Sequence, residues 1–114
     1  MLVKESITDW AKAIDLEILA VSYCKRCINN YLNDFIDDAK QYFGEYCPEK
    51  IDLELKKVYA IIDWKEQQYS HIIALVPIVY DCKEIGRYEL FFRIPSGEIY
   101  DDLLVIDGQE QLTY

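Results

Sequence analysis

The period at which hydrophobic residues recur changes once along the chain, and this change restricts the fold more than any other feature. Between Cys24 and Phe43 apolar side chains are spaced by three or four positions, which is typical of a helix with one buried face. From about residue 53 apolar and polar residues alternate, which is typical of a half-buried strand. A helical first half followed by a stranded second half predicts an α+β fold.

Two helices are expected in the first half. Ser6 and Asp9 have the spacing of an N-terminal capping box, so the first helix should begin near residue 7. Its end is left open because residues 14–18 also alternate as a strand would, although we favour helix there. The second helix should end near residue 43, because Gly44 can cap it and Pro48 follows. Its apolar stripe consists of Cys24, Cys27, Ile28, Tyr31, Leu32, Phe35, Ile36, Ala39 and Phe43.

Four strands are expected in the second half, at about 54–64, 69–80, 87–94 and 98–106. The second of them is apolar on both faces, as a central strand would be, and Pro77 should introduce a bulge or a bend because proline cannot donate a ladder hydrogen bond. Pro95-Ser96-Gly97 predicts a tight hairpin, and Asp107-Gly108 should end the last strand.

Short links between consecutive strands predict an antiparallel meander, and both helices must cover one of its faces. The expected architecture is therefore two N-terminal helices on a four-stranded antiparallel sheet, in the order ααββββ, as a single domain over residues 1–114. If the sheet curls around the helices, the result is cone-like and encloses an apolar cavity.

The chain of 114 residues carries 21 acidic and 12 basic side chains, a net charge of −9. A field of this sign repels nucleic-acid phosphates and anionic lipid head groups, and it attracts basic proteins. We therefore expect a basic protein partner and no nucleic acid. The sequence also lacks a secretory signal and an apolar segment long enough to span a membrane, so we expect a cytoplasmic protein.

The four cysteines offer one motif, Cys24-Lys25-Arg26-Cys27. This spacing occurs in redox and zinc sites, where basic neighbours lower the pKa of a thiol. The pair continues the apolar stripe of a helix, however, which favours buried and reduced structural thiols. A four-thiolate zinc site would need Cys47 and Cys82 to converge on this pair, and Asp101-Asp102 lacks the spacing of a calcium loop. We predict no metal and no cofactor.

His71 is the only histidine, and this limits the enzymes that the chain could be. A general acid–base pair of His71 with Asp63, Asp81 or Asp101 is conceivable inside a cavity lined by the sheet. No nucleophile motif surrounds any serine or cysteine, and the glycines form no phosphate-binding loop. The plainer interpretation is a strand histidine near a turn, so we predict that the chain is not an enzyme.

Acidic residues gather at three places, and tyrosines accompany them. A solvated acidic rim is the plainer interpretation. A binding surface is the other, because tyrosine contributes contact area with little loss of entropy and carboxylates pair with Lys or Arg on a basic partner. The residues that we expect to bind a partner are Glu98, Tyr100, Asp101 and Asp102, followed by Asp34, Asp37 and Asp38 on the second helix.

In its size, acidity and tyrosine-plus-carboxylate composition the chain resembles the small cytoplasmic immunity proteins of bacterial polymorphic and contact-dependent inhibition toxin systems. The resemblance covers bulk properties of the whole chain and no signature motif. It implies an inhibitor that neutralises a basic, nuclease-like toxin by direct binding. Two alternatives stay open, a cone-shaped ligand-binding domain or enzyme with His71 in an apolar pocket, and an oligomerising subunit that uses the open face of the sheet.

Overall fold

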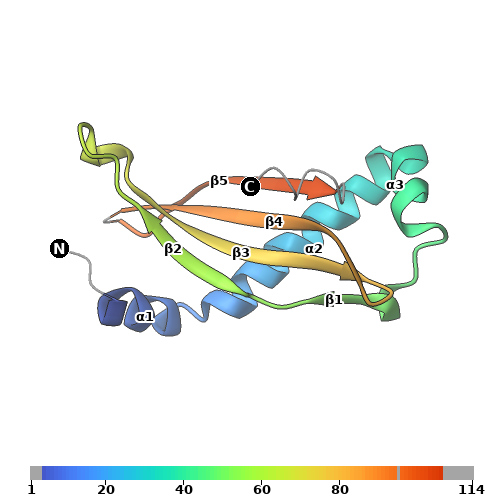
Figure 1. Ribbon diagram of the computed structural model, residues 1–114, viewed down its shortest axis with the longest axis horizontal. Helices are drawn as coiled ribbons and strands as arrows, with labels where there is room; N and C mark the ends of the chain where they lie inside the picture. The colour runs from blue at the N-terminus through green and yellow to red at the C-terminus, as the bar shows by residue number, and fades with distance from the viewer. Residues whose placement is uncertain (1–3, 95, 107–114) are drawn as a thin grey trace.

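The protein has an α+β fold, and in the part of the chain that the structure describes three α-helices accompany one antiparallel sheet of five strands (Figure 1). A computed structural model describes residues 4–94 and 96–106; Pro95 and the expected strand end at Asp107-Gly108 lie outside this range. The helices are α1 (Lys4–Ala13), α2 (Leu16–Asp34) and α3 (Ile36–Phe43). The strands are β1 (Ile51–Leu53), β2 (Lys57–Ile61), β3 (His71–Tyr80), β4 (Lys83–Arg93) and β5 (Ile99–Ile106). The predicted fold class is confirmed.

The sheet is the expected meander, except that its first strand is split. β1 and β2 both pair with β3, and β4 and β5 follow in order, all antiparallel. We expected one strand over residues 54–64; instead, residues 54–56 separate two short strands, and the gap lies opposite Val76 and Pro77. Pro77, where a bulge or a bend was expected, pairs in register with Arg87; the nearest register shift lies between Ile78 and Val79, where Ile85 of β4 is the extra residue.

The helical half contains two breaks, neither of them at a glycine or a proline. Asp15 adopts a left-handed backbone conformation (φ 51°), which separates α1 from α2 and rules out a strand at residues 14–18. Phe35 lies outside the helical region of backbone conformation (φ −129°, ψ 58°), and this divides the second predicted helix into α2 and α3. The described residues therefore form three α-helices where the periodicity predicted two helices.

The core lies between α2 and one face of the sheet. Leu16, Ala20, Cys24 and Ile28 follow at steps of four on α2 and are all buried. They pack against a row of buried side chains on β3 and β4, namely Ile72, Ala74, Val76, Ile78, Tyr80, Tyr88, Leu90 and Phe92. α1 and α3 contact the same face, through Trp10 on Phe92 and Phe43 on Tyr80. The three described helices thus leave the opposite face, called the open face below, uncovered.

The molecule is elongated, measuring 47 × 28 × 23 Å along its principal axes. α3 lies at one end of the long axis, and β5 begins toward the other (Figure 1). No helix in the described part of the chain combines the length and the apolar character that crossing a membrane requires.

Candidate functional site

The joint between α2 and α3 places two large hydrophobic side chains in solvent. Phe35 is 57% exposed and Ile36 is 56% exposed, although both continue the apolar stripe that predicted a core helix. Both backbone groups of Phe35 are hydrogen-bonded, because its amide donates to the Tyr31 carbonyl and its carbonyl accepts from the Ala39 amide, each at 2.9 Å. The break is therefore a stable turn that directs these side chains outward.

Three of the predicted binding residues surround this pair. Asp34 is the last residue of α2, and Asp37 and Asp38 stand in the first turn of α3; all three are exposed. Carboxylates in a first turn also interact favourably with the helix dipole, so they stabilise this short helix whatever else they do.

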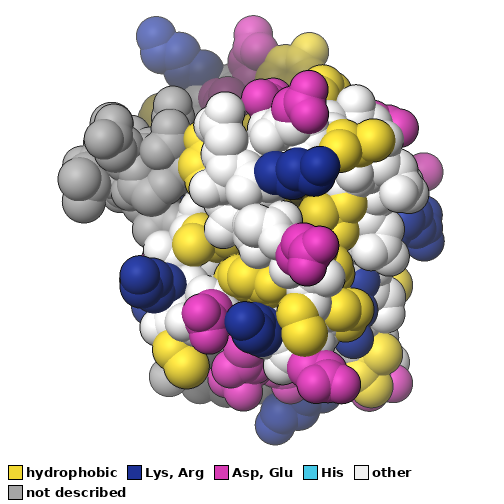
Figure 2. Space-filling model, turned by 90° about the vertical axis from the view of Figure 1, so that its right-hand side faces the viewer, with side chains coloured by type: hydrophobic (Ala, Val, Ile, Leu, Met, Phe, Trp, Pro, Cys, Tyr) yellow, Lys and Arg dark blue, Asp and Glu magenta, His cyan; other side chains and the backbone are white. Residues whose placement is uncertain are grey.

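Tyr31 completes the group. Its ring stacks on Phe35 with 5.9 Å between the centroids. Burial, and then the nearby Asp38 and Tyr42, raise the pKa of Tyr31, so its hydroxyl stays protonated at neutral pH. We refer to Tyr31, Asp34, Phe35, Ile36, Asp37 and Asp38 as the α2–α3 corner. Figure 2 views the molecule from the end that carries α3 and shows hydrophobic side chains at the surface with acidic and basic ones beside them.

The second set of predicted residues is divided between the two faces of the sheet by a bulge. Phe91 pairs with Asp101 but Phe92 pairs with Ile99, so Tyr100 is an extra residue in β5. Tyr100 lies on the open face, where the Arg93 guanidinium stands 4.6 Å from its ring centroid. Asp101 shares that face with its partner Phe91, and Glu98 is exposed in the preceding turn.

Asp102 points the other way, toward the helices. Its Oδ2 accepts a 2.7 Å hydrogen bond from the hydroxyl of Tyr88, which is fully buried. Burial, and then the charge of Asp102, raise the pKa of the Cys27 thiol on α2. Asp102 is thus tied to the core, whereas Glu98, Tyr100 and Asp101 face outward. A role of this segment in partner binding stays a prediction.

Sequence reasoning did not identify a second exposed apolar group, at the tip of the β2–β3 connection. Trp64 is 82% exposed and lies beyond the end of β2, although it was expected to be the last residue of a strand over residues 54–64. The tip is ordered by hydrogen bonds, because the Asp63 amide donates to Ser70 Oγ and the Glu66 amide donates to Asp63 Oδ1, both at 3.0 Å. The only sequence signal for it was the polar run that follows Trp64.

His71 stands at the start of β3 on the open face. Its Nδ1 lies 3.0 Å from the Tyr69 carbonyl oxygen, and its ring contacts Phe91 and Tyr100 edge-on. It therefore points away from the space between helices and sheet, where the alternative of a ligand-binding domain or enzyme placed it, and is the strand histidine near a turn that we favoured.

The cysteines are all unbridged. Burial raises the pKa of Cys24 to about 12, which makes its thiol unreactive, and Cys82 is exposed at the far turn of the β3–β4 hairpin. Within residues 4–94 and 96–106, no three Cys, His, Asp or Glu side chains gather in a way that could hold a metal ion.

Comparisons of the chain with protein-family models, with curated proteins and with solved structures found no match.

Proposed function

We propose that this protein is an acidic protein-binding module that occupies a cationic site on a basic protein, and that the α2–α3 corner is its main contact. The exposure of Phe35 and Ile36 among three carboxylates carries this proposal. Aromatic and aliphatic anchors contribute most of the affinity of an interface when a partner buries them. Carboxylates around the anchors pair with Lys and Arg and select a basic partner.

The net charge of −9 supports the same partner class, because it accelerates the encounter with a basic protein and slows that with an acidic one. An immunity-type inhibitor of a nuclease-like toxin fits these properties best. In such a complex the carboxylates of the corner take the place of substrate phosphates in the toxin's cationic site. The inhibitor would act in the cytoplasm, where the four thiols stay reduced.

The test is affinity purification of the tagged protein from its native host at low and at high salt, with mass spectrometry of what co-elutes. We expect one stoichiometric basic protein that high salt releases, since screening weakens charge pairs at a surface. Recovery of the protein alone at low salt contradicts the proposal.

Two matched variants locate the contact. Phe35→Ser should weaken binding about 30-fold, which is typical of losing a central aromatic anchor. Trp64→Ser removes an aromatic residue that is even more exposed, at the tip of the β2–β3 connection, and should leave the affinity unchanged. If Trp64→Ser weakened binding and Phe35→Ser did not, the contact surface would lie at that tip and not at the α2–α3 corner.

A further inference from the structure

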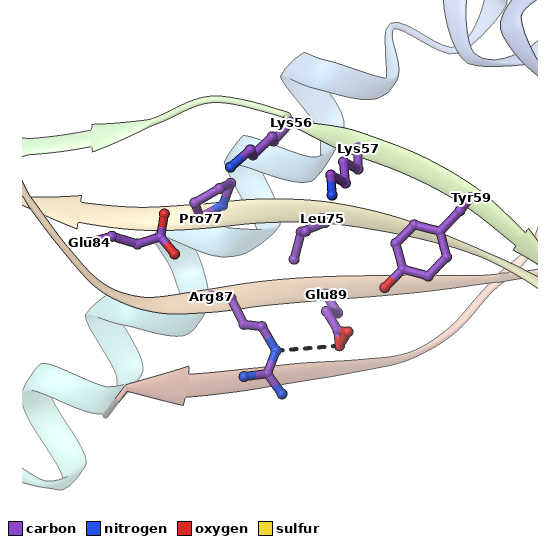
Figure 3. A pocket seen from close by; sticks show the side chains of 8 residues that line it. All are labelled: Lys56, Lys57, Tyr59, Leu75, Pro77, Glu84, Arg87 and Glu89. Carbon is purple, nitrogen blue, oxygen red and sulfur yellow. Dashed lines mark ion pairs between the residues drawn. The ribbon is translucent and has the colours of Figure 1, made fainter. Parts of the chain in front are cut away.

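A hollow of about 500 Å³ lies on the open face of the sheet, and it contains none of the residues discussed so far as partner contacts (Figure 3). Leu75 and Pro77 of β3 form its floor, and Tyr59 of β2 stands beside them. Its volume is in the range of small-molecule sites. The four other residues used below, Lys56, Lys57, Arg87 and Glu89, also line it, as does Glu84.

The split first strand places two lysines at this hollow. The Lys56 amide donates a 2.9 Å hydrogen bond to the Leu75 carbonyl, which fixes Lys56 where β2 begins. Lys57 pairs directly with Leu75 in the register of β2 and β3, so its side chain stands on the same face as Leu75. Figure 3 shows both ammonium groups extending toward the hollow.

The charges around the hollow are unevenly matched. Arg87 and Glu89 form an ion pair of 3.8 Å, so their charges largely offset each other. No carboxylate of the described residues lies within ion-pair distance of Lys56 or Lys57. Glu84 lies at one end, where a second hollow begins that Asp52 and Glu54 also line.

We propose that this hollow binds a small amphipathic anion, a carboxylate on an apolar chain, with the two lysines holding the carboxylate and the floor of β3 holding the chain. Charge-assisted hydrogen bonds from two ammonium groups orient such a ligand, and its chain covers apolar surface that is otherwise in contact with water. This site is independent of the α2–α3 corner.

The net charge of the protein allows binding at this hollow to be distinguished from binding at other apolar surfaces. A chain of charge −9 repels anions over most of its surface, so an exposed apolar patch elsewhere should prefer a neutral ligand to an anion of equal length. A preference for the anion can arise only where local cations outweigh that field. Comparing octanoate with octan-1-ol, which have the same chain length, therefore isolates the contribution of the lysines.

The experiment is a titration of the ¹⁵N-labelled full chain with sodium octanoate and, separately, with octan-1-ol, followed by amide chemical shifts. Octanoate should shift the amides of Lys57, Tyr59 and Leu75 most, and octan-1-ol should bind about tenfold more weakly, as expected for losing a charge-assisted contact. The double variant Lys56→Gln/Lys57→Gln should weaken octanoate binding by about the same factor and leave octan-1-ol unaffected.

The double variant Lys25→Gln/Arg26→Gln is the control, because it removes two exposed cations from α2 and should bind octanoate as the parent chain does. The amide spectrum of each variant shows directly whether it is folded. Equal affinity for both ligands, shifts centred on Phe35 or Trp64, or undiminished octanoate binding by Lys56→Gln/Lys57→Gln would each overturn the proposal.

Discussion

The hydroxyl of Tyr88 donates a 2.7 Å hydrogen bond to Oδ2 of Asp102, and this bond joins the inner faces of β4 and β5. Burial, and then this hydrogen bond, raise the pKa of Tyr88 far above its ordinary value, which favours the protonated hydroxyl that donates the bond. The neighbouring residue Asp101 pairs with Phe91 and lies on the opposite face of the sheet, because adjacent residues of a strand alternate between its faces.

Replacing Asp102 should therefore affect stability and replacing Asp101 should not. Asp102→Ala leaves a buried tyrosine hydroxyl without its partner, and we expect the free energy of unfolding to fall by about 1.5–3 kcal/mol. Asp101→Ala removes an exposed carboxylate that accepts a 2.8 Å hydrogen bond from the Asp102 amide, and because this bond lies in solvent its loss should change the free energy of unfolding by less than about 0.5 kcal/mol. Urea denaturation of both variants measures the difference, and equal losses would show that the hydrogen bond contributes nothing.

Stability should fall in alkaline solution, and Cys24 should account for part of the loss. Burial raises the pKa of the Cys24 thiol from 9.0 to about 12 in the folded state. Above pH 9 the unfolded chain releases this proton while the folded chain keeps it, so the folded state loses about 1.4 kcal/mol of stability per pH unit. Below pH 9 both states hold the proton, and the effect is absent.

Urea denaturation at pH 8, 9 and 10 tests this expectation. Cys24→Ala should reduce the decline between pH 9 and 10, in addition to a loss at every pH from the cavity it creates. Cys82→Ala, which alters an exposed thiol, should retain the full decline. An unchanged slope in Cys24→Ala would disprove the assignment to Cys24.

The hairpin turn between β3 and β4 carries backbone strain that a single substitution should relieve. Tyr80 pairs with Lys83, so only Asp81 and Cys82 form the turn, with φ values of 52° and 66°. Two positive φ values are typical of a type I′ turn, for which Asp-Gly is a preferred sequence. Cys82→Gly should raise the free energy of unfolding by about 0.5–1 kcal/mol, after allowing for the greater freedom of glycine when unfolded. In thermal unfolding Cys82→Ala, the control, should show no gain.

Gly86 should be among the least replaceable residues of the chain. A Cβ at this position of β4 would overlap the carbonyl oxygen of Val105 on β5, and backbone cannot move aside as a side chain can. Gly86→Ala should cost roughly 3 kcal/mol of stability by forcing the two strands apart. Gly44→Ala is the comparison, because a Cβ at Gly44 would have no atom within 4 Å. Only the φ of 62° is unfavourable for alanine there, so we expect a loss of about 1 kcal/mol in the free energy of unfolding. A Gly86→Ala protein as stable as Gly44→Ala would contradict the close approach.

Periodicity predicted the type of each half and the order of the sheet, because burial of one face imposes a period on a helix or a strand. It did not predict the helix break at Phe35, because the stripe continues through that residue without a glycine or a proline. A stripe records which positions are apolar and not whether another element covers them. Phe35 therefore looked like core and is the most prominent feature of the candidate site.

The same limit applies to the turns and to β5. We expected a link over residues 81–86, but Asp81 and Cys82 alone turn the chain, and both adopt a left-handed backbone conformation that is strained at Cys82. Adjacent residues of a regular strand lie on opposite faces, and from the sequence we grouped Tyr100 and Asp101 in one set without assigning them to a face. The bulge places both on the open face, and only the pairing with β4 reveals it.

The position of β5 has a further consequence, for behaviour at high concentration. It forms one margin of the sheet, and in the part of the chain that the structure describes its outer edge pairs with no other strand. Such an edge can template the addition of identical chains and lead to polymers. β5 contains two adjacent carboxylates and no Lys or Arg, so an incoming copy would meet charges of its own sign with nothing to offset them. The negative charge of this strand therefore opposes the growth of fibres from identical chains. A strand that carries Lys or Arg could still pair with this edge.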